Sequence, residues 1–227
     1  MAMQLFIGNK NYSSWSMRPW VLMRQLGLHF EEVMLRFDFG EHSHFRREVA
    51  RVSPAGRVPV LVDDGFAVWD SLAITEYLHD KFPGRGIWPD DIQSRARARC
   101  LAAEMHSGFG ALRSHCPMNI EAMLPDIGAK VWAEQAAVRA DVTRIELMWA
   151  QTLLASGGPF LFGEFGAVDA MYAPVCMRLR NFALPVPPSS QRYIDSMLAT
   201  PSVAAWMAQA LAEHDFFAED EPYRTQR

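Results

Sequence analysis

The chain has 227 residues, of which 50% are hydrophobic and 21% are charged, so a disordered or collagen-like chain is excluded. Its 22 Lys and Arg against 26 Asp and Glu give a formal net charge of −4. This balance lacks the basic excess that neutralising nucleic-acid phosphates requires. The three cysteines, Cys100, Cys116 and Cys176, are too few and too widely spaced for a disulfide framework, which favours a reducing compartment.

The sequence also gives no sign of a membrane or metal-binding protein. No basic amino-terminal region precedes a long apolar stretch, and no segment reaches the run of about 18 apolar residues that a membrane span needs. His42 and His44 lack a third ligand at metal-binding spacing. We therefore expect a soluble cytoplasmic protein that binds no metal, nucleic acid or membrane.

Up to residue 82, short strand-like runs alternate with helical stretches. The pattern predicts a strand, a helix and a strand, then a loop or short helix, a hairpin around Asp64-Gly65 and a closing helix. In chain order these elements cover residues 4–8, 15–26, 31–37, 45–51, 58–62 with 66–69, and 71–82.

A stretch rich in Pro and Gly follows, Pro83-Gly84-Arg85-Gly86 with Pro89, where no regular element can continue. Beyond it the helical period dominates, with helices predicted over residues 92–112, 127–154, 168–182, 191–198 and 203–211. We therefore expect a first domain over residues 1–82, a linker over 83–91 and an all-helical domain over 92–227, each with its own core. The acidic residues 219–221 are expected to be a solvated end.

Three serines lie between the first strand and the first helix. Ser13, Ser14 and Ser16 are good N-cap residues, and Pro19 is best tolerated in the first turn. The helix is therefore expected to begin close to Trp15.

Two further motifs suggest a ligand site. Pro59 stands at the entrance of a strand, where a cis X-Pro bond is typical and would leave the Val58 backbone free for a peptide-like ligand. Asp70 and Ser71 stand at the start of a helix, whose positive end attracts a carboxylate.

In combination these motifs resemble the soluble glutathione transferases over essentially the whole chain, and in particular a serine-type bacterial member. The segment Ser13-Ser14-Trp15-Ser16-Met17-Arg18 looks like the Ser-Ser-Cys-x-x-Arg of the zeta class, and Val58-Pro59-Val60-Leu61 and Asp70-Ser71-Leu72-Ala73-Ile74-Thr75-Glu76-Tyr77-Leu78 follow at the family's positions. The resemblance implies an α/β thioredoxin-like domain, βαβ–ββα, followed by an all-α domain. It also implies glutathione as co-substrate and a homodimer.

Carried over to this chain, the resemblance implies that Ser13 faces the glutathione sulfur, with Ser14 as the next candidate. Val58 would pair with the cysteinyl backbone beside a cis Pro59. Asp70 and Ser71 would hold the γ-glutamyl end. Arg57, and more weakly His44, would contact the glycyl carboxylate.

A hydroxyl at this place is enough to activate a thiol. Moving a thiol pKa from about 8.5 to about 6.5 requires roughly 2.7 kcal/mol. A hydrogen bond to a charged acceptor supplies about 1.5–3 kcal/mol, and a helix N-terminus adds about 0.3–1 kcal/mol. Trp15 stands where the zeta class has Cys, which disfavours thiol exchange; Cys100, Cys116 and Cys176 are expected to be buried apolar side chains.

A second substrate would lie between the two domains. Its expected pocket is lined by Trp15, Met105, His106, Phe109 and Arg113, although Met105 and Phe109, four residues apart, equally fit a helix core. Asp169, near the start of a helix at residue 168, is expected to be structural, with Gly166 in place of a capping hydroxyl. The isomerase arginine of the zeta class falls on Asn181 by direct count, with Arg178 and Arg180 expected on other faces.

The function expected from the resemblance is a detoxifying glutathione transferase that adds a serine-stabilised thiolate to a small electrophile. Two alternatives stay open: a glutathione-dependent isomerase of the maleylacetoacetate type, and a non-catalytic binding or assembly module with the same fold.

Overall fold

The computed structural model describes residues 3–227, and its first part is built on a mixed sheet of four strands. The strands are β1 (Met3–Ile7), β2 (Phe30–Met34), β3 (Val60–Asp63) and β4 (Phe66–Val68), in the order β2-β1-β3-β4. β1 pairs with β2 in parallel and with β3 antiparallel, and β3 pairs antiparallel with β4. This is the expected βαβ–ββα arrangement.

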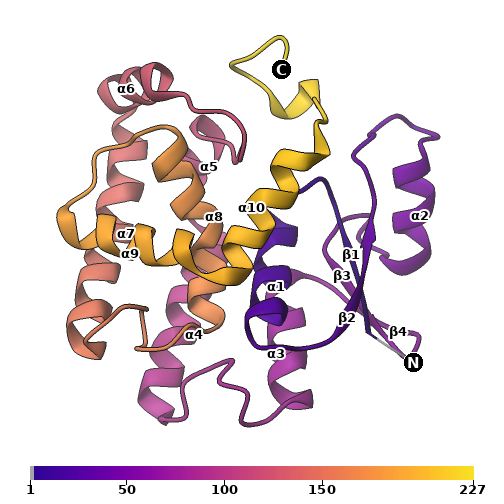
Figure 1. Cartoon of the computed structure of the whole chain (residues 1–227), viewed down its shortest axis with the longest axis horizontal. Coiled ribbons are helices and arrows are strands. Elements are labelled where there is room, and N and C mark those ends of the chain that lie inside the picture. Colours follow the sequence, from indigo (N-terminus) through magenta and orange to yellow (C-terminus); the bar gives the residue numbers. More distant parts are fainter. Residues whose placement is uncertain (1–2) are drawn as a thin grey trace.

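Helices cover both faces of the sheet. The helices of this part are α1 (Ser14–Gln25), α2 (His44–Val52) and α3 (Ser71–Lys81), so residues 45–51 belong to a helix. Side chains alternate along β1: Met3, Leu5 and Ile7 enter the main core, whereas Phe6 packs against the small cluster that includes α2. Figure 1 shows α1 and α3 between the sheet and the helical part, with α2 on the outer side.

Residues 82–91 contain no helix or strand, and almost all regular structure after them is helical. The elements are α4 (Ile92–Ser107), α5 (Gly110–His115), α6 (Pro125–Glu134), α7 (Ala136–Ser156), α8 (Ala167–Asn181), α9 (Pro188–Ala199), α10 (Pro201–Glu213) and the 3₁₀ turn η1 (Ala218–Asp220). None of the described helices is long and apolar enough to span a membrane.

Two of the predicted long helices are each broken in two. Gly108 and Phe109 separate α4 from α5, with Phe109 in the left-handed region at φ 55°. A Cβ on Gly108 would lie 2.6 Å from the Glu104 carbonyl oxygen, so this break needs glycine. Gln135 ends α6 and begins α7, and the Arg139 guanidinium donates to the Ala133 carbonyl at 3.0 Å, which satisfies part of the α6 end.

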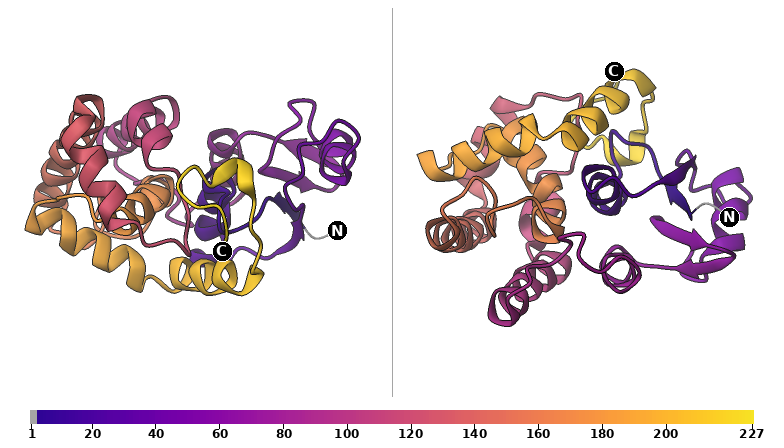
Figure 2. Two further views of the ribbon diagram at one scale, coloured as in Figure 1. Left: turned by 90° about the horizontal axis from the view of Figure 1, so that it is seen from above. Right: turned by 60° about the horizontal axis from the view of Figure 1, so that its bottom comes forward.

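The expectation of two separate cores is wrong. Buried side chains of the sheet and α1, such as Leu5 and Trp20, belong to the same hydrophobic cluster as Trp149 and Tyr172 of the helical part. This continuity arises because α1 packs against both α8 and α10, and Figure 2 shows α1 enclosed between them and the sheet. The first eighty residues therefore bury much of their apolar surface against the second half.

Three local expectations also need correction. The α1 helix begins at Ser14, so Pro19 lies in its second turn, where the Trp15 carbonyl lacks its usual intrahelical donor. Cys100 is exposed, whereas Cys116 and Cys176 are buried as expected. The acidic end is not fully solvated, since the Glu221 side chain is only 2% exposed.

Candidate functional site

The first part of the site is the connection between β1 and α1. Ser13 is the N-cap residue of α1, but its hydroxyl does not cap the helix and instead lies 2.7 Å from the Ser16 hydroxyl. The Ser16 oxygen also accepts the Gly8 N–H at 3.1 Å. Ser13 donates this hydrogen bond, so its proton becomes available to a ligand when the hydroxyl rotates away from Ser16.

Because no side chain caps α1, the N–H groups of its first turn keep their partial positive charge. Ser13 and Ser14 both line a cleft of about 520 Å³ in front of this helix end. The position suits an anionic ligand atom beside the Ser13 hydroxyl.

A smaller cavity of about 260 Å³ adjoins the cleft, and the two share Trp15, Arg57 and Val58. The Val58–Pro59 peptide bond is cis, as expected. Val58 lies two residues before β3 begins at Val60, so it is outside the β1–β3 register, which pairs Phe6 with Val60. The structure thus brings together residues expected to bind glutathione: the lining of the smaller cavity includes Arg57, Val58, Pro59, Asp70 and Ser71.

Asp70 and Ser71 line the smaller cavity at the start of α3. One Asp70 oxygen caps α3 by accepting the Leu72 N–H at 2.9 Å, and the other lies 3.1 Å from His106 Nε2. The Ser71 hydroxyl is buried without a hydrogen-bond partner, although a buried polar group ordinarily has one. This free hydroxyl at a helix start is consistent with a site for a carboxylate.

Three arginines lie at or beside the cleft: Arg113 and Arg178 line it, and Arg18 packs on the Trp15 ring. The guanidinium carbon of Arg18 lies 4.0 Å from the Trp15 ring centroid, and that of Arg113 lies 5.4 Å from it. Arg178 donates to the Ser14 hydroxyl at 3.3 Å and to the Cys116 carbonyl at 2.5 Å. Within residues 3–227, no ion pair neutralises any of the three.

Burial and mutual repulsion affect two of these arginines. Burial, followed by the charges of Arg178 and Arg113, lowers the pKa of Arg18 to about 9. Burial lowers the pKa of Arg178 to about 10, and the charge of Arg113 adds to this effect. Both groups stay protonated at neutral pH, so this side of the cleft is positively charged, although Asp220, which also lines the cleft, stabilises the charge of Arg178.

The expectation that Arg178 lies on another face of its helix is wrong. Arg178 lines the cleft together with Arg113 and Trp15, whereas Asn181 is buried and donates to the Ile120 carbonyl at 3.4 Å. Direct counting from Asp169 failed because the rotation of α8 about its axis is set by its packing on α1 and α4.

Other expected site residues are not brought to the cavities. His44 is exposed at the first turn of α2 and lines neither cavity, whereas Arg46 of the same turn lines the cleft. Met105 and Phe109 are buried in the main core, which favours the core alternative for both. Trp15, His106 and Arg113 do line the cavities.

Several residues of the site have no clear signal in the sequence. The sequence indicates only a cap for Ser16, which contacts Ser13 but does not line the cleft, and only a solvated tail for Asp220, which lies on the cleft wall. Phe37 and Phe39 also line the cleft; Phe37 ends the strand predicted over residues 31–37, and no local pattern marks either ring as part of a site. No local pattern marks Asp220, because its place depends on the path of the chain after α10.

The remaining reactive groups do not suggest other chemistry. Burial raises the pKa of the Cys116 thiol to about 12, so it is no nucleophile at neutral pH. Among residues 3–227 no three metal-ligating side chains form a group that could hold a metal ion.

Comparison with known proteins agrees with this geometry. The family model described as "Glutathione S-transferase, N-terminal domain" matches residues 12–81, and "Glutathione S-transferase, C-terminal domain" matches residues 131–209. Glutathione S-transferase 1 of Dianthus caryophyllus is 30% identical over 174 residues, which cover 76% of this chain and 75% of the relative. The chain belongs to the glutathione S-transferase family.

The chain is also similar to a second curated relative and to a solved structure. Maleylacetoacetate isomerase of Rattus norvegicus is 26% identical over 177 residues, 78% of each chain. The solved structure of a glutathione transferase homologue from Burkholderia gl BGR1, with bound glutathione, has a TM-score of 0.67 at 24% identity and covers 92% of this chain and 98% of its own. At that identity the likeness shows that this glutathione S-transferase has the family's fold.

Proposed function

We propose that this glutathione S-transferase binds glutathione across the two adjoining cavities and transfers its thiolate to a small electrophile. The Val58 backbone would pair with the cysteinyl unit, Asp70 and Ser71 would hold the γ-glutamyl end, and Arg57 would contact the glycyl carboxylate. His44 has no part in this proposal. The expected division into residues 1–82, 83–91 and 92–227 is kept as a description of roles: the first part binds glutathione and the last supplies the electrophile pocket.

The observation that carries the proposal is the position of the Ser13 hydroxyl. It stands at the uncapped start of α1, on the cleft, where it donates to Ser16 and can turn its proton to a ligand instead. A thiol placed beside it gains a hydrogen bond to its charged form and the field of the helix end, which together lower a thiol pKa. The nearby positive charges of Arg18 and Arg178 act in the same direction.

The decisive experiment is a comparison of Ser13→Ala with wild type and Ser14→Ala. Loss of the hydroxyl is expected to raise the pKa of bound glutathione by about one to two units, which lowers the thiolate fraction at neutral pH by about three- to 25-fold. Turnover with a small electrophile should fall accordingly, with little change in glutathione affinity, and Ser14→Ala should lose less. Equal activity in wild type and Ser13→Ala overturns the assignment, and failure of wild type to bind millimolar glutathione supports a non-catalytic module.

A second function, glutathione-dependent isomerisation of a maleyl-type acid, is favoured by the arginines. Arg113 and Arg178 line the cleft and form no ion pair within residues 3–227, so both can bind a carboxylate of a dicarboxylic acid. The likeness to a protein named maleylacetoacetate isomerase supports the same idea. In this alternative Ser13 keeps its role, because isomerisation also begins with a thiolate attack.

We further propose a homodimer. Large exposed apolar side chains lie on β4, directly after it and at the start of α4, namely Phe66, Trp69 and Ile92. Sedimentation velocity is expected to give twice the 25.7 kDa of one chain.

A further inference from the structure

The four residues that precede Ser13 are all bound to the last part of the chain. We call residues 213–224, which begin at the last residue of α10, the C-terminal strap; Figures 1 and 2 show that it lies beside the β1–α1 connection. The hydrogen bonds are Asn9 Nδ2 to Asp215 at 2.7 Å, Lys10 N to Glu213 at 2.8 Å, Asn11 N to Glu213 at 3.3 Å and Tyr12 Oη to Glu221 at 2.8 Å.

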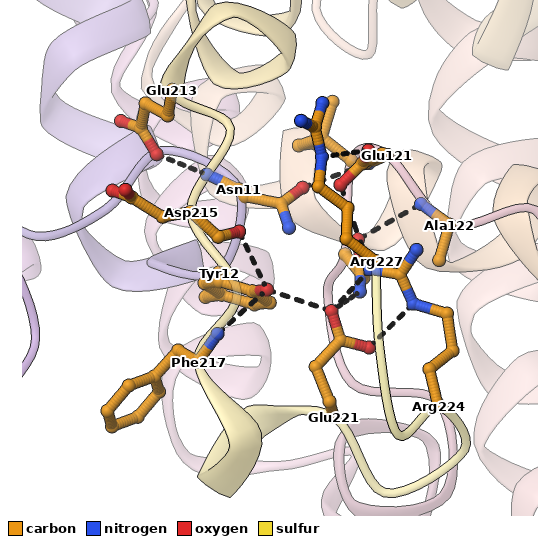
Figure 3. A network of polar contacts seen from close by, with 12 residues as sticks. Asn11, Tyr12, Glu121, Ala122, Glu213, Asp215, Phe217, Glu221, Arg224 and Arg227 are labelled. Carbon is orange, nitrogen blue, oxygen red and sulfur yellow. Dashed lines mark hydrogen bonds and ion pairs between the residues drawn. The ribbon is translucent and has the colours of Figure 1, made fainter.

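Glu221 is the buried centre of this contact, as Figure 3 shows. Its side chain is 2% exposed and accepts hydrogen bonds from Tyr12, from Asn119 at 2.7 Å and from Arg224 at 2.9 Å. Burial by itself raises the pKa of Glu221, but the hydrogen bonds from Arg224 and Tyr12 hold it below its usual value. Glu221 is thus a buried ionised acceptor with all its donors in place.

Tyr12 and Ser13 are consecutive residues whose backbone is held by hydrogen bonds. The N–H groups of Tyr12 and Ser13 both donate to the Asn9 carbonyl, at 3.1 and 2.8 Å, so the two residues belong to one tight turn. The Tyr12 hydroxyl points to the strap, where it also accepts the Phe217 N–H at 3.2 Å. If the Tyr12 ring moves, we therefore expect the Ser13 backbone in the same turn to move with it.

The same strap borders the cleft. Asp220 is among the cleft residues, and the Phe217 ring packs on Phe39 and Phe37 with centroids 5.1 and 5.7 Å apart. Strap and cleft wall are thus continuous in space, although they are far apart in sequence.

We propose that Glu221 is a positioning residue for the Ser13 hydroxyl, acting through Tyr12. This inference rests on the proposed function of Ser13 and adds a residue from the opposite end of the chain. A buried carboxylate suits the role because it can accept from Tyr12, Asn119 and Arg224 together. An amide in its place offers one oxygen, and its NH₂ group faces a donor, so at least one of these bonds is lost.

The test compares Glu221→Gln, Tyr12→Phe and the double variant with wild type. Tyr223→Phe is a matched control, because it removes a hydroxyl from the same strap that donates instead to the His115 carbonyl at 2.8 Å. The measurements are the pH titration of bound glutathione by thiolate ultraviolet absorbance, kcat and KM with a small electrophile, and amide hydrogen exchange of residues 8–16 in the free protein.

We expect both single variants to raise the pKa of bound glutathione by about one unit and to lower kcat at neutral pH about threefold, with KM for glutathione within about twofold. The double variant should lose no more than the larger single loss, since both changes break one contact. Exchange of residues 8–16 should rise in the two variants, and Tyr223→Phe should match wild type throughout.

Other outcomes overturn the proposal. A loss in Tyr12→Phe with wild-type values in Glu221→Gln would assign the Tyr12 hydroxyl a direct role, and a rise in KM with unchanged kcat would assign the strap to substrate binding. If wild type binds no glutathione, the proposed function fails, whereas the exchange of residues 8–16 still decides whether Glu221 orders the Ser13 turn: unchanged exchange in Glu221→Gln overturns it.

Discussion

Ser13 and Ser16 act as a pair because they stand one helical turn apart at the start of α1. The Ser16 hydroxyl is fully buried, 2.7 Å from that of Ser13, and accepts the Gly8 N–H. A hydroxyl held in this way has a fixed orientation, which a thiolate-binding group requires. Ser16 therefore contributes to the site although it does not line the cleft.

Ser16→Ala is expected to shift the pH dependence of turnover to higher pH by about half a unit to one unit, because the Ser13 hydroxyl loses its partner. The variant should also lose about 1–3 kcal/mol of stability, since the buried Gly8 N–H is left without an acceptor. Ser202→Ala is the control, because the buried Ser202 hydroxyl has no partner to lose. An unchanged pH profile in Ser16→Ala would refute the orienting role.

Arg113 offers a direct test of the isomerase alternative, because it lines the cleft and is only half-buried. Arg113→Gln is expected to lower kcat/KM for a dicarboxylic electrophile about tenfold more than for a neutral one, the equivalent of one charge-assisted hydrogen bond. Arg144→Gln, which removes an arginine paired with Glu104 on the surface, should change neither. Equal losses for the two electrophiles would exclude an anionic second substrate at Arg113.

At the level of helices, α8 is the element on which the site depends most, since it supplies Arg178 and packs on both α1 and α4. Its start is fixed by Asp169, which accepts the Gly166 N–H at 3.0 Å, the Leu161 N–H at 3.1 Å and the Tyr193 hydroxyl at 2.9 Å. The structural role expected for Asp169 is confirmed. Gly166 serves as N-cap without a side chain, as its position in the sequence indicated.

Asp169 also predicts a pH dependence of stability. Burial raises its pKa to about 6 from an ordinary value of 3.8, against the effect of its hydrogen bonds. Because the folded pKa is the higher one, the contribution to stability is complete below about pH 4 and is lost as the pH rises through about 6.

Relative to Asp169→Asn, wild type should therefore lose about 2.4 kcal/mol of unfolding free energy between pH 4 and pH 7. Urea unfolding of both proteins at the two pH values measures this difference, and other titrating groups cancel in the comparison. Parallel pH profiles would show that Asp169 is ionised with an ordinary pKa.

For the molecule as a whole, the continuous core implies that the two halves unfold together. Leu5 and Trp20 share one hydrophobic cluster with Trp149 and Tyr172, and Arg178 reaches from α8 to the Ser14 hydroxyl. We expect a single thermal transition with equal calorimetric and van't Hoff enthalpies. A separate early transition of the sheet would show that the halves are independent units.

The sequence by itself determined the features that depend on neighbouring residues. Strands, helix starts, the cis Val58–Pro59 corner and the Asp70-Ser71 cap follow from side-chain alternation, capping groups and the proline ring, all of which act within a few positions. Ser13, Val58 and Asp70 each stand in a short motif, and the resemblance of these motifs to those of the glutathione transferases selected the three residues together.

Only the tertiary structure decided which distant groups meet at the site. Tyr12 and Glu221 are 209 positions apart, and Ser14 and Arg178 are 164 apart. Such contacts depend on how α8 is rotated and on where the chain runs after α10, and both are set by packing against α1 and the β1–α1 connection. The sequence around Glu221 is the same whether this residue lies in a solvated tail or in a buried contact. Only the fold therefore shows that Glu221 is buried.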